Sequence, residues 1–239
     1  MIPKKIHYCW FGHGEPPQLA QDCIASWRHF MPDWEYKHWS EDNFDVGKIP
    51  YTKEAYEAGK FAFVSDYVRL WALVNEGGLY LDVDFIAYKS FEDLLRWKAF
   101  AGFEGSKHAP LMMGVCASEP HGEWATAMLH AYDGRHFLLP DGKMDLTTNV
   151  QFITAIMSAN GFRQDGSEQD YGDLHVFPVD YFCPRQTTGE YFRTENTYCE
   201  HLGLDSWAGR NGGWKIWVKK KIGPKNMTRL IKLKRKLFG

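Results

Sequence analysis

Cysteine is scarce in this sequence, and the few cysteines follow no pattern. The 239 residues include five cysteines, at positions 9, 23, 116, 183 and 199, and no two of them stand in a Cys-x-x-Cys spacing. A disulfide framework needs paired cysteines, and a structural zinc site needs closely spaced ones. We therefore expect neither, and the composition favours a reducing cytoplasm as the compartment.

Long hydrophobic runs and a recognisable leader are also missing. No apolar stretch approaches the roughly 18 residues that a membrane-spanning helix needs. At the N-terminus Pro3, Lys4 and Lys5 lead directly into a strand-like run instead of the apolar core of a signal peptide. The sequence thus favours a protein without a secretory leader or a membrane-spanning helix.

Acidic residues are absent from residues 214–239, which contain ten Lys or Arg. Residues 1–213 hold 18 basic and 30 acidic residues, a charge of −12, although the whole chain carries only −2. Apolar residues between 230 and 238 alternate with charge as in an amphipathic helix. We expect a domain over 1–213 and a basic helical tail over 214–239 that binds an anionic membrane. A solvated helix is the alternative; the acidic body argues against nucleic-acid binding.

The order of the elements predicts an α/β fold. Strand patterns cover 6–11, 34–39 and the run that starts at 79, and helical patterns cover 19–30, 53–60 and 62–75. Later segments predict strands at 99–103 and 175–178 and helices at 122–132 and 149–160. Such alternation predicts a mostly parallel sheet flanked by helices, with ligands at the carboxyl ends of the strands. The aromatic content of 16%, with 10 Trp, exceeds what a minimal core needs, so we expect some rings in a ligand cleft.

The most informative segment is 77–84, which reads Gly-Gly-Leu-Tyr-Leu-Asp-Val-Asp. In an extended strand Asp82 and Asp84 point the same way. Two adjacent carboxylates repel each other unless a cation neutralises them, and hard oxygen ligands suit Mg²⁺ or Mn²⁺, which can hold a diphosphate. Solvated turn carboxylates are the alternative. In this apolar context we favour a metal-dependent nucleotide-sugar site.

Other candidate site residues flank this motif. Asp66 and Arg69 are i,i+3 neighbours in an apolar helix, either as a structural ion pair or as a pair that binds sugar hydroxyls. Trp10 and Phe11 precede a glycine loop. One of them is expected in the core, while Trp10 is the candidate to stack on a nucleobase. The hydroxyl of Tyr80 is placed to reach a ribose.

Residues 201–213 include four glycines and resemble a mobile flap. Its His201 is a candidate third metal ligand, since imidazole suits Mn²⁺ alongside carboxylates. Ser206 and Trp207 can donate hydrogen bonds to phosphate oxygens. A single histidine more often has an ordinary polar role than a role as a metal ligand.

Together these segments resemble glycosyltransferase family 32, the DXD sugar transferases that include yeast mannosyltransferases and bacterial capsule enzymes. The resemblance rests on residues 2–12 (Ile-Pro-Lys-Lys-Ile-His-Tyr-Cys-Trp-Phe-Gly), on 62–70, on 77–84 and on His201 with Ser206 and Trp207. It is strongest over about the first 105 residues. The glucosylating domain of large clostridial toxins is also similar.

The resemblance implies a GT-A fold, a nucleotide-sugar donor, a divalent metal and retention of the anomeric configuration. It implies that Trp10 stacks on the base and that Tyr80 and Asp82 meet ribose or metal. Asp84 would bind the metal directly, and Asp66 with Arg69 would hold the donor sugar. The set that would close over the diphosphate is His201, Ser206 and Trp207.

We therefore expect a hexosyltransferase that builds bacterial surface polysaccharide at the inner face of the cell membrane. UDP-galactose or UDP-glucose is favoured as donor, then UDP-N-acetylglucosamine, with GDP-mannose as an alternative. A protein-glycosylating effector would be marked by a secretion signal or a targeting domain, neither of which is seen. A catalytically dead sugar-binding module would lack one aspartate of the pair. A nucleotidyltransferase would carry a glycine-rich phosphate loop followed by lysine.

Overall fold

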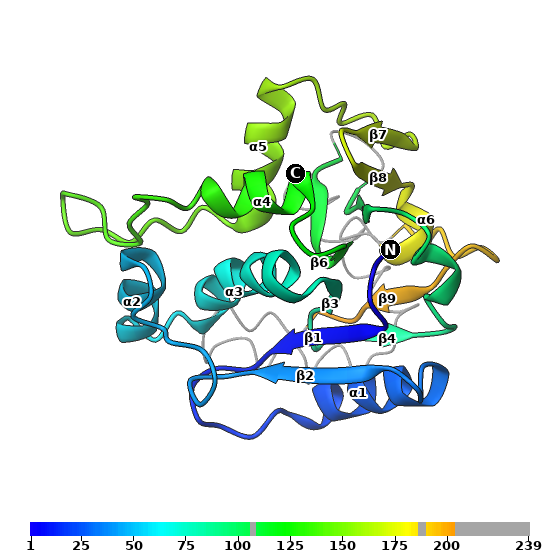
Figure 1. Cartoon of the computed structure of the whole chain (residues 1–239), viewed down its shortest axis with the longest axis horizontal. Coiled ribbons are helices and arrows are strands. Elements are labelled where there is room, and N and C mark those ends of the chain that lie inside the picture. The colour runs from blue at the N-terminus through cyan, green and yellow to red at the C-terminus, as the bar shows by residue number, and fades with distance from the viewer. Residues whose placement is uncertain (106–108, 186–189, 204–239) are drawn as a thin grey trace, which may run out of the picture.

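The fold centres on one seven-stranded sheet in a computed structural model that describes residues 1–105, 109–185 and 190–203 (Figure 1). The strand order is β2-β1-β3-β6-β5-β8-β7, and β4 pairs with β9 in a separate ribbon. The strands are β1 Lys5–Cys9, β2 Glu35–Trp39, β3 Gly78–Leu81, β4 Phe85–Ala87, β5 Ala99–Phe103, β6 Leu111–Ser118, β7 Gln169–Tyr171, β8 Leu174–Phe177 and β9 Cys199–His201.

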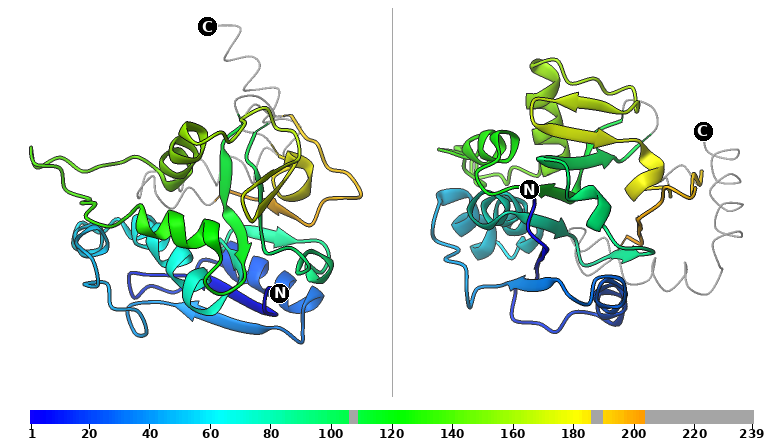
Figure 2. Two further views of the ribbon diagram at one scale, coloured as in Figure 1. Left: turned by 45° about the horizontal axis from the view of Figure 1, so that its top comes forward. Right: turned by 45° about the vertical axis from the view of Figure 1, so that its right-hand side comes forward.

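Helices cover both faces of this sheet. In Figure 2 (right), α2 to α5 lie on one side, while α1, α6 and the β4–β9 ribbon lie on the other. The helices are α1 Gln18–Phe30, α2 Pro50–Glu57, α3 Phe61–Glu76, α4 Glu123–His130, α5 Asn149–Ala159 and α6 Val179–Phe182, with a 3₁₀ turn at Glu92–Leu94. In the part of the chain that the structure describes, no helix is both long enough and apolar enough to span a bilayer.

The sheet is mixed, with most strands running in one direction. Parallel pairing joins β1 to β2, β1 to β3 and β5 to β8, whereas β6 and β7 run opposite to their neighbours. The predicted α/β architecture is thus confirmed, and a helix or strand overlaps each predicted segment in the described residues, although β3 ends at Leu81. The pattern analysis missed β4, β6, β7, β9 and α6. Most of these are only three or four residues long, and β6 is buried along its whole length and shows no alternation.

Two glycines end α3 and start β3. Gly77 has φ +63° and Gly78 has φ +120°, which confirms the tight turn expected from the sequence. A Cβ atom on Gly78 would lie 2.6 Å from the backbone oxygen of Lys5 in β1. This close approach sets the position of β3 against β1, and β3 leads directly into the two aspartates.

Replacing Gly78 by alanine should lower the free energy of unfolding by about 2 kcal/mol or more, since the backbone conformation and the Lys5 carbonyl both resist a Cβ atom. Chemical denaturation measures this loss. Gly59→Ala is the matched control, because Gly59 has φ +65° but no atom within 4 Å of the added Cβ. Equal losses in the two variants would contradict the close-packing explanation.

Candidate active site

The two aspartates lie at the carboxyl end of β3, in a turn. The strand ends at Leu81, and the N–H of Phe85 donates to the carbonyl of Asp82 at 3.1 Å. The expectation of an extended strand through Asp84 is therefore wrong, because the chain turns there to begin β4. Asp82 and Asp84 consequently face different partners.

Arg69 holds Asp82 and Asp66 together. Its Nη2 donates to Asp66 Oδ1 at 3.0 Å and to Asp82 Oδ1 at 3.3 Å, and its Nη1 donates to the Met113 carbonyl at 2.6 Å. The guanidinium lies 4.7 Å from the centroid of the Tyr80 ring. Asp66 and Arg69 are buried. The pair predicted from the α3 sequence is therefore a rigid part of the same network as the first aspartate.

Tyr80 completes this network. Its ring is buried, and its hydroxyl donates to Asp82 Oδ1 at 2.8 Å. Tyr80 thus orients Asp82, and its contact with a ribose stays a prediction.

Asp84 pairs with His201 across the β4–β9 ribbon. His201 Nε2 lies 3.0 Å from Asp84 Oδ2, and its ring stacks on Phe85 at a centroid distance of 4.7 Å. His201 therefore lies beside the second aspartate, and its role as a metal ligand stays a prediction. It lies in a strand, however, and not in a mobile flap, because Phe85 and His201 are paired residues of the two strands. Burial opposes the charged imidazole, but Asp84 outweighs it and raises the pKa of His201 to about 9.

The donor set around Asp84 has the right chemistry for a divalent cation. Carboxylate oxygen and imidazole nitrogen are ligands for Mn²⁺, and a cation between Asp84 and His201 would replace the proton that they share. Across residues 1–105, 109–185 and 190–203, no three His, Cys, Asp or Glu side chains are grouped closely enough to hold a metal on their own. Of the predicted trio, Asp84 pairs with His201, whereas Asp82 pairs with Arg69. The remaining ligands of a bound cation would come from diphosphate and water.

Sequence reasoning missed several residues that shape this site. The backbone N–H of Asn149, at the start of α5, hydrogen-bonds to Asp66, and Arg135 adds a nearby positive charge. Glu104, just after β5, lies within electrostatic reach of His201 and Asp82, and burial raises its pKa. A Cβ atom on Gly114 would lie 2.9 Å from Asp82 Oδ2. No local pattern marks these positions, because strands and helices distant in the sequence bring them to the motif.

The pKa of Asp66 predicts a pH dependence. Burial raises it to about 6, although Arg69 acts in the opposite direction. The ionised form pairs with Arg69, so donor turnover should fall as the pH drops through about 6. A pH profile of kcat/KM for donor hydrolysis tests this. The profile of Asp66→Asn should lack the fall on the acidic side, which is its acidic limb. An unchanged limb in the variant would assign the titration to another group.

The remaining predicted residues occupy different environments. Trp10 is half-buried and directly follows β1, and its stacking on a base stays a prediction. Phe11 is a core residue with its ring against Phe44, and neighbouring residues on an extended segment face opposite sides. This burial favours the core role for Phe11 over the predicted contact with a cofactor. Ser206 and Trp207, like the tail over 214–239, lie outside the described residues.

The five cysteines are free and buried. Burial raises the pKa values of Cys9 and Cys116 to about 12, so neither thiol is a nucleophile at neutral pH. This agrees with the expectation that no disulfide organises the chain.

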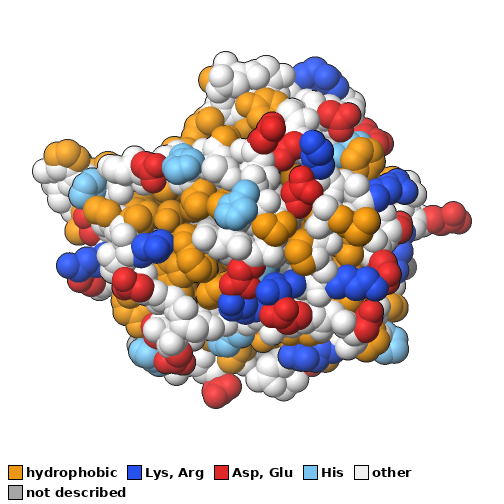
Figure 3. Space-filling view, viewed as in Figure 1, with side chains coloured by type: hydrophobic (Ala, Val, Ile, Leu, Met, Phe, Trp, Pro, Cys, Tyr) orange, Lys and Arg blue, Asp and Glu red, His pale blue; other side chains and the backbone are white. Residues whose placement is uncertain are grey.

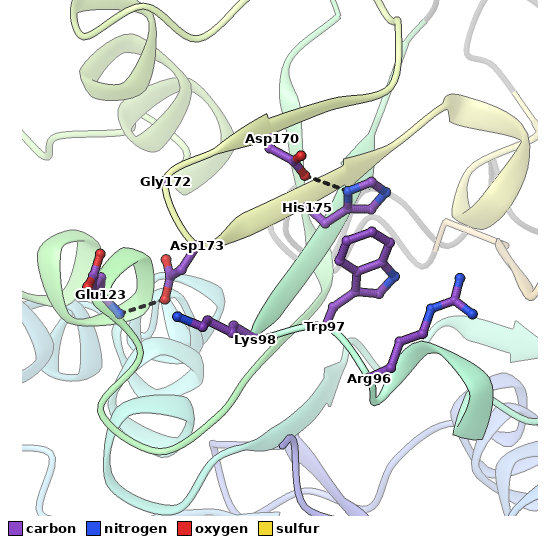
Figure 4. Close-up of a pocket in the computed structure, with 8 residues that line it drawn as sticks. All are labelled: Arg96, Trp97, Lys98, Glu123, Asp170, Gly172, Asp173 and His175. Carbon is purple, nitrogen blue, oxygen red and sulfur yellow. Dashed lines mark hydrogen bonds and ion pairs between the residues drawn. The ribbon is translucent and has the colours of Figure 1, made fainter.

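A separate pocket of about 370 Å³ lies at the amino ends of β5 and β8 (Figure 4). Lys98 and Asp173 line it just before β5 and β8 begin, whereas the aspartates follow the end of β3. Trp97 stacks on His175 at 3.7 Å within it. This pocket is therefore not part of the donor site.

Part of the chain is similar to known glycosyltransferases. Residues 17–101 match the family model described as a glycosyltransferase sugar-binding region containing the DXD motif. Inositol phosphoceramide mannosyltransferase 3 of Schizosaccharomyces pombe is 29% identical over 41% of this chain and 29% of its own length. Subversion of eukaryotic traffic protein A of Legionella pneumophila is 26% identical over 38% of this chain and 18% of its own length. The matched segment thus spans less than a third of either relative.

A solved structure supports the fold. The glycosyltransferase involved in glycosylation of the major capsid of PBCV-1 aligns with a TM-score of 0.50 at 11% identity, covering 88% of this chain and 98% of that chain. At this identity the likeness concerns the fold, namely the sheet and its covering helices. Over residues 17–101 the chain is thus similar to the sugar-binding region of DXD glycosyltransferases, and it has the GT-A fold.

Proposed function

We propose that the protein is a metal-dependent, retaining glycosyltransferase that moves a hexose from a nucleotide sugar to a saccharide acceptor. The observation that carries this is the network in which buried Arg69 bonds both Asp66 and the half-buried Asp82, together with the Asp84–His201 pair. A bound Mn²⁺ or Mg²⁺ would neutralise charge on the departing diphosphate. Asp66 and Arg69 would hold hydroxyls of the hexose, and Trp10 would stack on the base.

We propose same-face attack for the transfer. The bond between the anomeric carbon and the phosphate oxygen breaks, the acceptor oxygen bonds to that carbon from the same side, and the diphosphate takes the acceptor's proton. Asp66 is engaged by Arg69 at 3.0 Å, which suits positioning better than nucleophilic attack. Detection by mass spectrometry of a hexose bonded to an enzyme carboxylate would contradict this step.

The donor is proposed to be UDP-galactose or UDP-glucose, then UDP-N-acetylglucosamine. The acceptor is proposed to belong to bacterial surface polysaccharide, made at the inner face of the cell membrane. GDP-mannose is the alternative donor, and the similarity to a fission-yeast mannosyltransferase supports this alternative. The Legionella relative, named for subversion of eukaryotic traffic, keeps a protein-glycosylating effector as the second candidate.

Hydrolysis of a nucleotide-sugar panel tests these proposals directly. Wild-type protein is assayed with UDP-galactose, UDP-glucose, UDP-N-acetylglucosamine and GDP-mannose, each with Mn²⁺ and with EDTA. We expect metal-dependent release of UDP from one hexose donor. Preference for GDP-mannose would select the mannosyltransferase alternative, and no turnover of any donor would overturn the proposed function.

Removal of residues 214–239 should weaken binding to anionic vesicles by on the order of tenfold or more, because ten basic residues are lost. Donor hydrolysis should persist in the shortened protein. Vesicle sedimentation of both proteins, at low and high salt, measures the effect. Unchanged vesicle binding would show that the tail does not bind the membrane.

A further inference from the structure

Arg135, in the loop that follows α4, is enclosed by aromatic rings. Its Cζ lies 3.8 Å from the ring centroid of Phe152, 4.8 Å from that of Tyr51 and 5.3 Å from that of Tyr132. Its Nη2 donates to Asp145 Oδ2 at 2.8 Å, and only 11% of its side chain is exposed. These contacts join α2, the loop after α4 and α5, which pack around α3 (Figure 1), and apolar side chains gather on the surface around α2 and α3 (Figure 3). A single guanidinium thus ties three segments together in apolar surroundings.

Several polar atoms around Arg135 have no hydrogen-bond partner among the described residues. In that part of the chain, eight buried side-chain nitrogen or oxygen atoms lack such a partner. Four of the eight are Oη of Tyr51 and Tyr132, Nη1 of Arg135 and Nδ2 of Asn149. Each of these four residues also interacts with Asp66, by charge or through the backbone N–H of Asn149. Buried polar side chains often stabilise a fold no more than apolar ones would, so their gathering around one carboxylate points to a role at the site.

The ion pair of Arg135 with Asp145 leads along the chain to Asp66. Asp145 Oδ1 also accepts from the N–H of Thr147 at 3.0 Å, and a capping box directly after it fixes where α5 begins. The first N–H of α5, at Asn149, hydrogen-bonds to Asp66 in α3. The Arg135–Asp145 ion pair therefore sets the start of α5 against the carboxylate of the sugar-binding pair.

We propose that Arg135 is a positioning residue for the donor hexose, because it holds Asp66 in the orientation in which Asp66 and Arg69 bind the sugar. The inference rests on the proposed function, which assigns Asp66 and Arg69 to the hexose. Aromatic rings and Asp145 surround the guanidinium of Arg135, so it acts through Asp66 and not by its own contact with the sugar. Its loss should therefore impair the use of a hexose donor and spare the binding of a nucleoside diphosphate, which lacks the hexose.

The test compares Arg135→Met with the wild-type protein in the full chain. Methionine keeps an unbranched side chain among the rings but has no charge to pair with Asp145. Hydrolysis of UDP-galactose, UDP-glucose, UDP-N-acetylglucosamine and GDP-mannose is measured with Mn²⁺, and calorimetry measures the affinity for UDP and GDP with Mn²⁺. For the donor that the wild-type protein turns over, we expect kcat/KM to fall about tenfold or more, while the affinity for the matching nucleoside diphosphate stays within about twofold of wild type.

Further variants separate positioning from a general distortion of the fold. Arg135→Lys keeps a charge that can pair with Asp145, so it should recover most of the kcat/KM that Arg135→Met loses. Arg163→Met is the matched control, because the ion pair of Arg163 with Asp165 is exposed, and it should change neither kcat/KM nor the affinity. Circular dichroism and urea denaturation show whether each variant folds. If Arg135→Met does not fold, Asp145→Asn takes its place, because it removes the same ion pair and leaves the guanidinium among its rings.

The outcomes distinguish this inference from the proposed function. Wild-type kcat/KM in the folded variant that lacks the ion pair would overturn the inference and leave the proposed function standing. Equal losses of kcat/KM and of nucleoside diphosphate affinity would also overturn it, by showing that the whole site is distorted. If the wild-type protein turned over none of the four donors, the proposed function would fail, and this inference with it.

Discussion

Replacement of Asp84 by asparagine is expected to reduce metal-dependent donor hydrolysis by about a hundredfold or more. Asp84 pairs with His201 at 3.0 Å, and the side-chain amide is a poor substitute for an anionic metal ligand. The affinity for Mn²⁺ with nucleotide should fall in parallel, which isothermal titration calorimetry measures. Because Asp84 is buried beside a titratable partner, the removal of its charge should also bring the pKa of His201 down from about 9.

Asp133→Asn is the control for this variant, since Asp133 is exposed and forms an ion pair with the exposed His130. It should hydrolyse the donor at the wild-type rate. Full activity and Mn²⁺ affinity in Asp84→Asn would refute the metal assignment, whatever donor the protein uses.

Replacement of Arg69 by methionine should have the largest combined effect on activity and stability. It removes the donors to Asp66, Asp82 and the Met113 carbonyl together. Loss of one partner from a buried ion pair costs about 3–5 kcal/mol, because the other charge stays buried. We expect a loss of that size in urea denaturation and donor hydrolysis reduced about a hundredfold or more.

Arg69→Lys separates the two effects if the methionine variant does not fold. Lysine keeps the charge but cannot bond two carboxylates and a carbonyl from one planar group. It should recover much of the stability and little of the turnover. Arg163→Lys is the control, because the side chain of Arg163 is exposed. It should change neither the stability nor the turnover. Wild-type turnover in Arg69→Lys would show that Arg69 acts only as a structural ion pair.

Local sequence patterns predicted this fold well where the elements are long. The helices at 18–30 and 61–76 have the periodicity and stop signals that local chemistry supplies, and the glycines at 77 and 78 mark the turn into β3. Strand β6 was missed because it is buried at all eight positions and shows no alternation. Local patterns also place Asp66 three residues before Arg69, but they do not show that Arg69 reaches Asp82.

The amino-acid sequence alone establishes the α/β order and the DXD motif, together with the positions of Asp66, Arg69, Asp82 and Asp84. These depend on spacing within a few residues, which local backbone geometry translates directly into structure. Only the tertiary structure decided that Asp82 faces Arg69 and Tyr80 while Asp84 faces His201, and that Asn149 and Glu104 join the site. Those contacts join residues up to 117 positions apart, so they depend on how strands and helices pack and not on any local pattern.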